Sequence, residues 1–105
     1  MLYTIEQIKE RVTPIAEKHN LRAVYLFGSY ARGEATENSD IDFLVDPSEN
    51  TDRRWMYGGL YNDLCEVFGE STDMITVNGL NQKSTQERTP WFFNNVNNEK
   101  VKLYG

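Results

Sequence analysis

The first twenty residues carry apolar side chains at the spacing of one helix face. Thr4 followed three residues later by Gln7 forms a capping-box pattern at the start of this stretch, which satisfies two backbone donors at a helix N-terminus. The pattern predicts a helix from Thr4 toward Asn20. The apolar residues recur at intervals of one, three or four: Ile5, Ile8, Val12, Ile15 and Ala16.

Pro14 lies inside this helical pattern. Its ring removes a backbone donor and clashes with the preceding turn. We therefore expect the helix to kink at Pro14, or to restart there with Thr13 as its cap.

Three later stretches have the character of β-strands. Residues 21–27 are short, apolar and aromatic and end at the Gly28-Ser29 turn, while residues 72–77 contain Asp73 and end at Asn78-Gly79. Both predict strands bounded by turns. Residues 40–45 alternate with a period of two, which predicts a strand with distinct faces. One face holds Asp40, Asp42 and Leu44, and the other holds Ile41, Phe43 and Val45.

Further helices are expected between and after these strands. Residues 52–68 have near-helical apolar spacing and stop at Gly69, and the pair Gly58-Gly59 weakens this helix or lets another element pack closely,. Thr89-Pro90 has the form of a cap and first position of a final short helix,. Residues 101–104 are expected as a terminal strand or a docking tail. This alternation predicts an α/β fold with one central sheet flanked by helices.

Composition narrows the class of protein. A chain of 105 residues with 39% hydrophobic residues predicts one folded domain over residues 1–105,. A net charge of −5 argues against direct nucleic-acid binding, which depends on Lys and Arg,. A single cysteine excludes an intrachain disulfide and favours the reducing cytoplasm,. No apolar run has the length of a membrane span, so no membrane association is expected.

The Asp40-Ile41-Asp42 pair is the strongest chemical signal. Two residues apart on a strand, the two carboxylates share one face and lie roughly 6 to 7 Å apart, while Ile41 points to the opposite face. Mg²⁺ prefers carboxylate oxygens together with phosphate and water. Like charges left so close without a cation are costly. The pair therefore predicts a divalent metal site for nucleotide chemistry.

Phosphate-binding groups are expected at the end of the first strand. Gly28 permits close approach of the backbone to a ligand, and the Ser29 hydroxyl with nearby amides could hold a terminal phosphate. Arg32, one helical turn beyond Ser29, is expected to supply positive charge. A third carboxylate from a neighbouring strand would accept the proton of the attacking hydroxyl or complete the metal shell, and Asp73 is the candidate.

Other charged residues have simpler interpretations. Asp46 continues the face of Asp40 and Asp42, but it precedes Pro47 and is expected to begin a turn,. Glu34 and Glu37 fall in a loop where charge serves solubility. His19 ends the first helix, where a cationic ring is favoured by the helix dipole. Several aromatic residues could anchor a partner, although most are expected in the core: Trp55, Tyr57, Tyr61, Trp91 and Phe92.

The segment Gly28-Ser29-Tyr30-Ala31-Arg32-Gly33, with Asp40-Ile41-Asp42 following after ten residues between Ser29 and Asp40, closely resembles the DNA polymerase β-like nucleotidyltransferases. Its small size resembles the minimal nucleotidyltransferase family within that superfamily. The resemblance implies a mixed sheet and Mg²⁺-dependent transfer of a nucleoside monophosphate, with AMP from ATP expected and two metal ions. It assigns metal binding to Asp40 and Asp42, and less directly to Asp73.

The same resemblance implies a protein partner. Members of the minimal family are often encoded beside a small helical protein of the HEPN class and act as antitoxins that adenylylate a tyrosine of that toxin. Larger enzymes of the superfamily carry a second domain for the acceptor, whereas here the catalytic module occupies the whole sequence. Two alternatives stay open: a non-catalytic antitoxin that masks its partner, and a nucleotidyltransferase for a small molecule of the aminoglycoside type.

Overall fold

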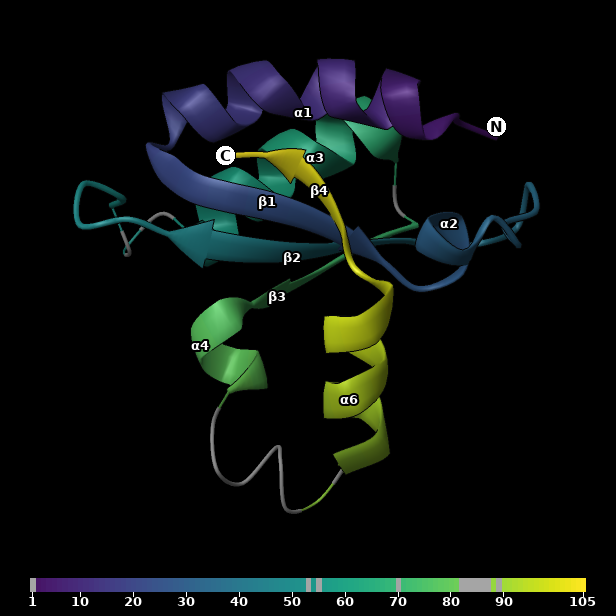
Figure 1. Cartoon of the computed structure of the whole chain (residues 1–105). Coiled ribbons are helices and arrows are strands. Elements are labelled where there is room, and N and C mark those ends of the chain that lie inside the picture. The colour runs from purple at the N-terminus through teal and green to yellow at the C-terminus, as the bar shows by residue number, and fades with distance from the viewer. Residues whose placement is uncertain (1, 53, 55, 70, 82–87, 89) are drawn as a thin grey trace.

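A four-stranded sheet separates two layers of helices in the computed structural model (Figure 1). The structure describes residues 2–52, 54, 56–69, 71–81, 88 and 90–105, and only the backbone of residues 56, 57 and 93. The elements in chain order are α1 (Ile5–Lys18), β1 (Leu21–Phe27), α2 (Ser29–Arg32), β2 (Ile41–Pro47), the π-helix η1 (Met56–Leu60), α3 (Tyr61–Phe68), β3 (Thr72–Thr76), α4 (Val77–Leu80), α6 (Pro90–Glu99) and β4 (Val101–Tyr104).

The sheet is mixed, with the strand order β3-β2-β1-β4. β1 pairs antiparallel with both β2 and β4, whereas β2 and β3 are parallel. A parallel pair needs a crossover connection, and α3 lies in the segment between these two strands. The predicted architecture, a central mixed sheet flanked by helices, is therefore confirmed. The terminal segment is a strand, which settles the choice left open for residues 101–104.

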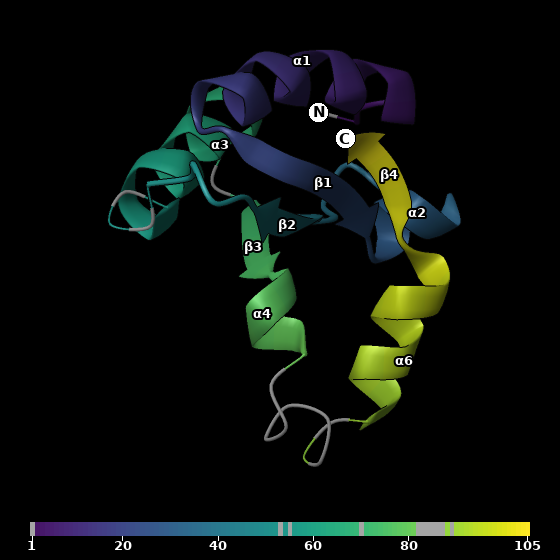
Figure 2. The same cartoon turned by 60° about the vertical axis from the view of Figure 1, so that its left-hand side comes forward.

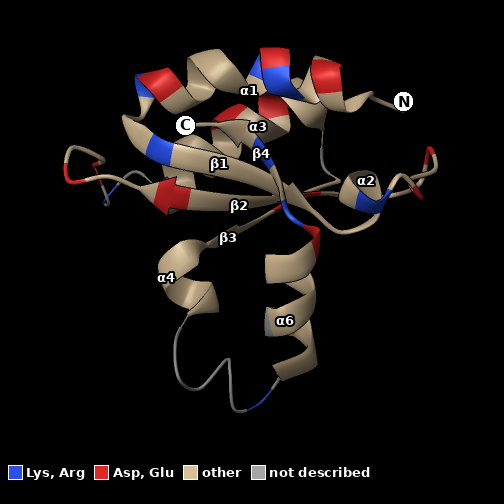
Figure 3. Ribbon diagram, in the orientation of Figure 1, with Lys and Arg blue, Asp and Glu red and all other residues tan. Residues whose placement is uncertain are grey.

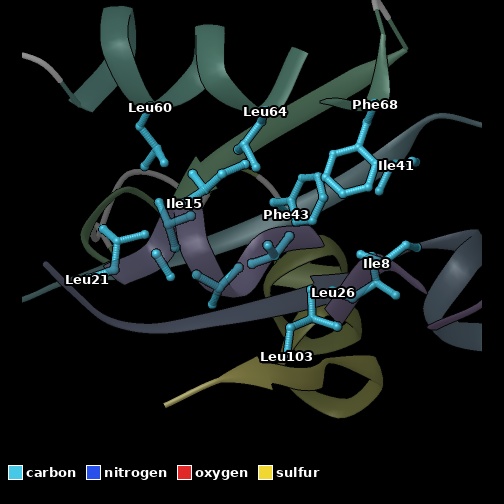
Figure 4. Close-up of a cluster of buried hydrophobic side chains, with 14 of the residues drawn as sticks. Ile8, Ile15, Leu21, Leu26, Ile41, Phe43, Leu60, Leu64, Phe68 and Leu103 are labelled. Atoms are coloured by element: carbon cyan, nitrogen blue, oxygen red, sulfur yellow. The ribbon is translucent and has the colours of Figure 1, made fainter. Parts of the chain in front are cut away.

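The larger core lies between the sheet and the layer formed by α1 and α3 (Figure 4). Phe43 is fully buried, and its ring lies 5.4 Å from that of Phe68. Each such side chain stabilises the fold by about 1.5–3 kcal/mol when it is removed from water. The face of β2 predicted to be apolar supplies Ile41, Phe43 and Val45 to this core, with Ile8, Val12, Leu64 and Leu103 from other elements.

A second, smaller core covers the opposite face of the sheet. It consists of Phe27 from β1, Leu44 from β2, Leu80 from α4 and Val96 from α6. Figure 2, turned from the first view, places α4 and α6 on the side of the sheet away from α1. Because side chains alternate along a strand, Asp42 shares this face with Leu44. The sheet face that carries the predicted site is thus only partly covered.

α1 begins as predicted but passes through Pro14 without interruption. Thr4 accepts a hydrogen bond from the Gln7 amide, and the Gln7 side chain accepts one from the Thr4 amide. The prediction of a restart at Thr13 is wrong, because α1 is one helix from Ile5 to Lys18. Instead of capping, the Thr13 hydroxyl donates to the carbonyl of Lys9 at 2.8 Å. This bond to the preceding turn is compatible with a continuous helix.

The helix predicted over residues 52–68 is shorter and is divided. A π-helical turn over Met56–Leu60 leads into α3, which ends at Gly69 as expected. Gly58 and Gly59, the pair expected to weaken this helix, lie within the π-helical turn. Residue Trp55 lies outside the described part of the chain, as does the side chain of Tyr57.

The last predicted boundaries differ only slightly from the structure. β3 ends at Thr76, whose hydroxyl accepts from the Gly79 amide at 2.9 Å and caps α4. The segment predicted as a simple Asn78-Gly79 turn is therefore a short helix. α6 begins at Pro90 as predicted, while Thr89 is not among the described residues. None of the described helices combines the length and apolar character that a bilayer crossing requires.

An ion-pair cluster fastens the end of α1 to α3. Oδ2 of Asp63 lies 2.7 Å from Nε2 of His19 and 3.0 Å from Nζ of Lys18. The hydrogen bond with His19 is the main cause that lowers the pKa of Asp63, and Lys18 adds to it. His19 therefore has a structural role, because its contact with Asp63 joins the end of α1 to α3.

Replacing this carboxylate tests the cluster. A carboxylate with a lowered folded pKa stabilises the protein above its unfolded pKa and loses that contribution as the pH falls. We expect Asp63→Asn to lower the free energy of unfolding by about 1 kcal/mol at pH 7, and the difference from the wild type to vanish well below about pH 4. Urea unfolding at several pH values measures this. A pH-independent difference would contradict the assignment.

Candidate functional site

A cavity of about 250 Å³ opens on the less covered face of the sheet. Its walls come from the ends of the central strands, from α2 and from α6. Four of the six predicted site residues line it, namely Gly28, Arg32, Asp42 and Asp73. The remaining lining residues are Phe27, Ile75, Trp91, Phe92, Asn95, Val96 and Glu99.

The two strand carboxylates lie side by side. In the parallel pairing of β2 with β3, Asp42 is the register partner of Asp73. Adjacent strands are about 4.8 Å apart, so both carboxylates face the cavity from neighbouring strands. Asp73 is exposed, and its Oδ1 accepts a hydrogen bond from the Met74 amide at 2.9 Å. The pairing of β3 with β2 thus positions Asp73, the third predicted carboxylate, beside Asp42.

Asp40 and Ser29 stand beside the cavity without lining it. Asp40 is exposed and lies one residue before β2 begins. Ser29 is half-buried and is the first residue of α2, next to Gly28. Both therefore stay adjacent to residues that do line the cavity.

Asp42 has the most perturbed electrostatic environment of the site. Burial, and then the charges of Asp73 and Asp40, raise its pKa to about 6, and the charge of Arg32 partly opposes this shift. Desolvation and neighbouring like charge both disfavour an ionised carboxylate. A cation placed among these groups would relieve that cost. Strongly perturbed carboxylates in a cleft are typical of functional sites.

The donor set fits a hard divalent cation that arrives with its substrate. Within the described residues, no three carboxylate, imidazole or thiolate side chains form a ready-made metal cage. Mg²⁺ is usually held by one or two carboxylates, and phosphate oxygens and water complete its octahedron. Asp42 and Asp73, with Asp40 nearby, offer only oxygen ligands. The arrangement therefore suits Mg²⁺ bound together with a phosphate ligand.

Gly28 is required by the geometry of the site. Its backbone has φ 77° and ψ −153°, a region that is essentially restricted to glycine,. A Cβ built at this position would collide with Oδ2 of Asp42 and lie 3.2 Å from its Cγ. The turn after β1 thus brings backbone directly against the carboxylate, as a phosphate-binding turn requires.

Arg32 is held at the rim of the cavity by two carboxylates. Its Nε donates to Oε2 of Glu34 at 3.1 Å, and its Nη1 donates to Oε2 of Glu99 at 3.0 Å. Glu34, and then Glu99, raise the pKa of the Arg32 guanidinium. Glu34, in a loop where charge is expected mostly to serve solubility, is largely exposed and also forms this ion pair with Arg32. Arg32 keeps 40% of its side chain exposed, so it can contact an anion in the cavity.

The wall contributed by α6 was not predicted as part of the site. Trp91, Asn95 and Glu99 line the cavity at intervals of four residues, which places them on one face of the helix,. That regular spacing is visible in the sequence, but nothing local indicates that this helix packs beside Asp42. Trp91 and Phe92 had been considered only as core residues or partner anchors.

Two carboxylates on adjacent strands, a glycine turn against one of them and an arginine at the rim are the features of a nucleotide-transferring enzyme. The family model described as "Polymerase beta, Nucleotidyltransferase" matches residues 10–89. The chain therefore belongs to the polymerase β-type nucleotidyltransferase family, and its activity is nucleotidyl transfer.

Relatives with overall similarity carry more specific names. A candidate protein adenylyltransferase of Methanocaldococcus jannaschii is 40% identical over 76 residues, which are 72% of this chain and 81% of the relative. A second candidate protein adenylyltransferase of the same organism is 36% identical over 93 residues, covering 80% of this chain and 93% of the relative. Both relatives are thus matched over most of their length.

A solved structure has the same fold. The superposition has a TM-score of 0.65, with 24% sequence identity, and covers 92% of this chain and 73% of the other. That structure is described as a toxin–antitoxin with AMP-PNP. At this identity the likeness establishes the nucleotidyltransferase fold.

The Gly28 turn provides a direct test of the site geometry. We expect Gly28→Ala to lower the free energy of unfolding by about 2–4 kcal/mol, because backbone strain adds to the collision with Asp42. The affinity of this variant for nucleotide should also fall. Urea unfolding and calorimetric titration with an ATP analogue measure the two effects.

Gly33→Ala is the matched control for this variant. Gly33 also has a positive φ of 74°, but a Cβ there would meet no atom within 4 Å. It should therefore lose only about 1 kcal/mol from left-handed strain and keep nucleotide affinity. Equal losses for the two variants would show that the contact with Asp42 does not matter.

Proposed function

We propose that this chain transfers AMP from ATP to a protein hydroxyl, a tyrosine of a helical HEPN-type toxin, and so acts as the antitoxin of a toxin–antitoxin pair. The names of the two Methanocaldococcus relatives support a protein acceptor. The structural neighbour, a toxin–antitoxin with AMP-PNP, supports both the partner and the nucleotide. The pairing of Asp42 with Asp73 beside Gly28 is the observation that carries the proposal.

On the donor side, Asp40, Asp42 and Asp73 would hold Mg²⁺, with two ions expected. When bound, Mg²⁺ neutralises the triphosphate and stabilises the charge on the departing pyrophosphate. Gly28 and Ser29 would receive the terminal phosphate through the backbone amides of this turn and the Ser29 hydroxyl. Arg32 would add positive charge from the rim of the cavity.

The transfer step requires a proton acceptor next to the attacking hydroxyl. The hydroxyl oxygen forms a bond to the α-phosphorus of ATP, the bond from that phosphorus to the bridging oxygen breaks, and pyrophosphate leaves. The hydroxyl proton passes to a carboxylate. We assign that role to Asp73, because its exposed side chain lies at the cavity and its Oδ2 is not used in the bond with Met74,.

Removing one metal ligand tests the mechanism. Asp42→Asn keeps the side-chain volume but weakens cation binding, so transfer of labelled AMP to the co-expressed partner should fall by about 100-fold or more, the order of loss expected when a charge-stabilising group is removed. The variant should unfold at the same or a higher urea concentration, because one of three neighbouring like charges is gone.

Asp46→Asn is the matched control, since Asp46 lies on the same strand and is also half-buried. It should retain the wild-type rate. Undiminished transfer by Asp42→Asn would refute the assigned mechanism.

The masking alternative gives a different result. An antitoxin that acts by binding alone would neutralise its partner even when Asp40 and Asp42 are both replaced by Asn. We expect this double variant to lose neutralisation in a growth assay, although it still binds the partner in a pull-down. Full neutralisation by the double variant would overturn the catalytic proposal in favour of masking.

A further inference from the structure

The lining of the cavity contains two chemically different groups of residues. One group is Gly28, Arg32 and the two aspartates, and the other forms an aromatic and apolar wall. In Figure 3, the described part of α6 is drawn without charged residues except at the end next to β4. A nucleoside triphosphate has the same division, with an anionic tail and a flat, nearly uncharged base. The aromatic and apolar wall adjoins the turn proposed to bind phosphate, because Phe27 directly precedes Gly28 in the chain.

Trp91 is exposed and contacts one neighbouring ring. It leaves 64% of its surface open to solvent. Its ring meets Phe92 edge to face at 6.0 Å between centroids, and Phe92 meets Phe27 in the same way at 6.1 Å. Phe27 is the residue before Gly28, so this row of rings links the indole to the phosphate turn. An exposed indole next to another ring is suited to stacking against a planar ligand.

Asn95 lies one helical turn beyond Trp91 on the same face of α6 and also lines the cavity,. Its side chain is exposed, and no hydrogen bond links it to another residue within the described part of the chain. A carboxamide presents one donor and one acceptor side by side. This pair is complementary to the N6 amino group and N7 of adenine.

We propose that Trp91 and Asn95 form the nucleobase subsite of this enzyme and select adenine. Trp91 stacks on the ring, and the Asn95 carboxamide reads its N6 and N7 edge. This inference rests on the proposed function, because it assigns ATP to the same cavity. The volume of about 250 Å³ is below the roughly 300–1,000 Å³ of sites that enclose a whole drug-sized ligand,. It suits a base and part of the sugar, with the triphosphate reaching out over the aspartates.

The other aromatic group that could enter the cavity is the acceptor tyrosine. A phenol has a single hydroxyl, which must reach the α-phosphorus and so cannot also satisfy the donor and acceptor of Asn95. The wall is also contributed by α6, which begins at Pro90, beyond the residues 10–89 that match the family model. A specificity element outside the shared catalytic segment can differ without disturbing the metal ligands.

Binding measurements on the full chain test the stacking role without any acceptor. With Mg²⁺ and a non-hydrolysable ATP analogue, Trp91→Ala should raise Kd about 10-fold or more, and Trp91→Phe should restore most of the affinity. Urea unfolding establishes that both variants are folded. Quenching of tryptophan fluorescence by the analogue should be present in the wild type and strongly reduced in Trp91→Phe. Unchanged Kd in Trp91→Ala would overturn the proposal, and an effect confined to the KM of the acceptor would assign the cavity to the tyrosine.

Base selection is tested at Asn95. Asn95→Leu should weaken binding of the ATP analogue about 10-fold and leave the weaker binding of the GTP analogue nearly unchanged, so discrimination is lost. Asn98→Leu is the control, because Asn98 is exposed on the same helix but does not line the cavity. Equal discrimination in the two variants would refute the reading role. Adenine binding that depends on both residues in a protein unable to transfer AMP would sustain this subsite and refute the proposed function.

Discussion

The parallel register between β2 and β3 is the constraint on which the site depends. It sets Asp42 beside Asp73 on a sheet face that is only partly covered. Two like charges at neighbouring strand positions oppose folding, and partial burial adds to the cost, as the raised pKa of Asp42 indicates,. The protein tolerates this arrangement because the opposite face of the same strands packs against α1 and α3. The free energy gained by burying the larger apolar core therefore offsets the electrostatic cost of placing these carboxylates on the opposite face.

The turn after β1 and the short helix α2 lie close to these carboxylates. The turn after β1 can approach Asp42 only because residue 28 has no side chain. The short helix that follows this turn ends at Arg32, whose two ion pairs reach both the next loop and α6. The Arg32 guanidinium thus links the end of α2 and the loop after it to the distant helix α6. The phosphate end of the cavity and its aromatic wall are joined by this residue at the rim and by the row of rings beneath.

Local patterns predicted much of this fold, and their limits are physical. The alternation around Asp42 indicated which side chains face the core, because strand geometry alone determines that outcome. The glycine turn and the capping box of α1 are equally local. A restart of the helix at Thr13 does not occur, because tertiary packing of α1 outweighs the local cost of Pro14. Asp73 could be proposed as a site residue, but its position opposite Asp42 could not be predicted, since the register between strands depends on long-range contacts. The contacts of Arg32 with Glu99 and the position of α6 depend on the same long-range packing, and no short segment contains that information.

The C-terminal strand has a consequence that reaches beyond the sheet. β4 follows α6 after a single residue and pairs with β1 so that Val101 lies beside Leu26, two residues before Gly28. The hydrogen-bonded ladder therefore anchors the last turn of α6 to the strand that delivers the glycine turn. The glycine turn and the end of α6, some seventy residues apart in the chain, are therefore both attached to the same pair of strands. A ligand that contacts both the glycine turn and α6 finds them already held at a fixed separation. Little conformational entropy is therefore lost on binding.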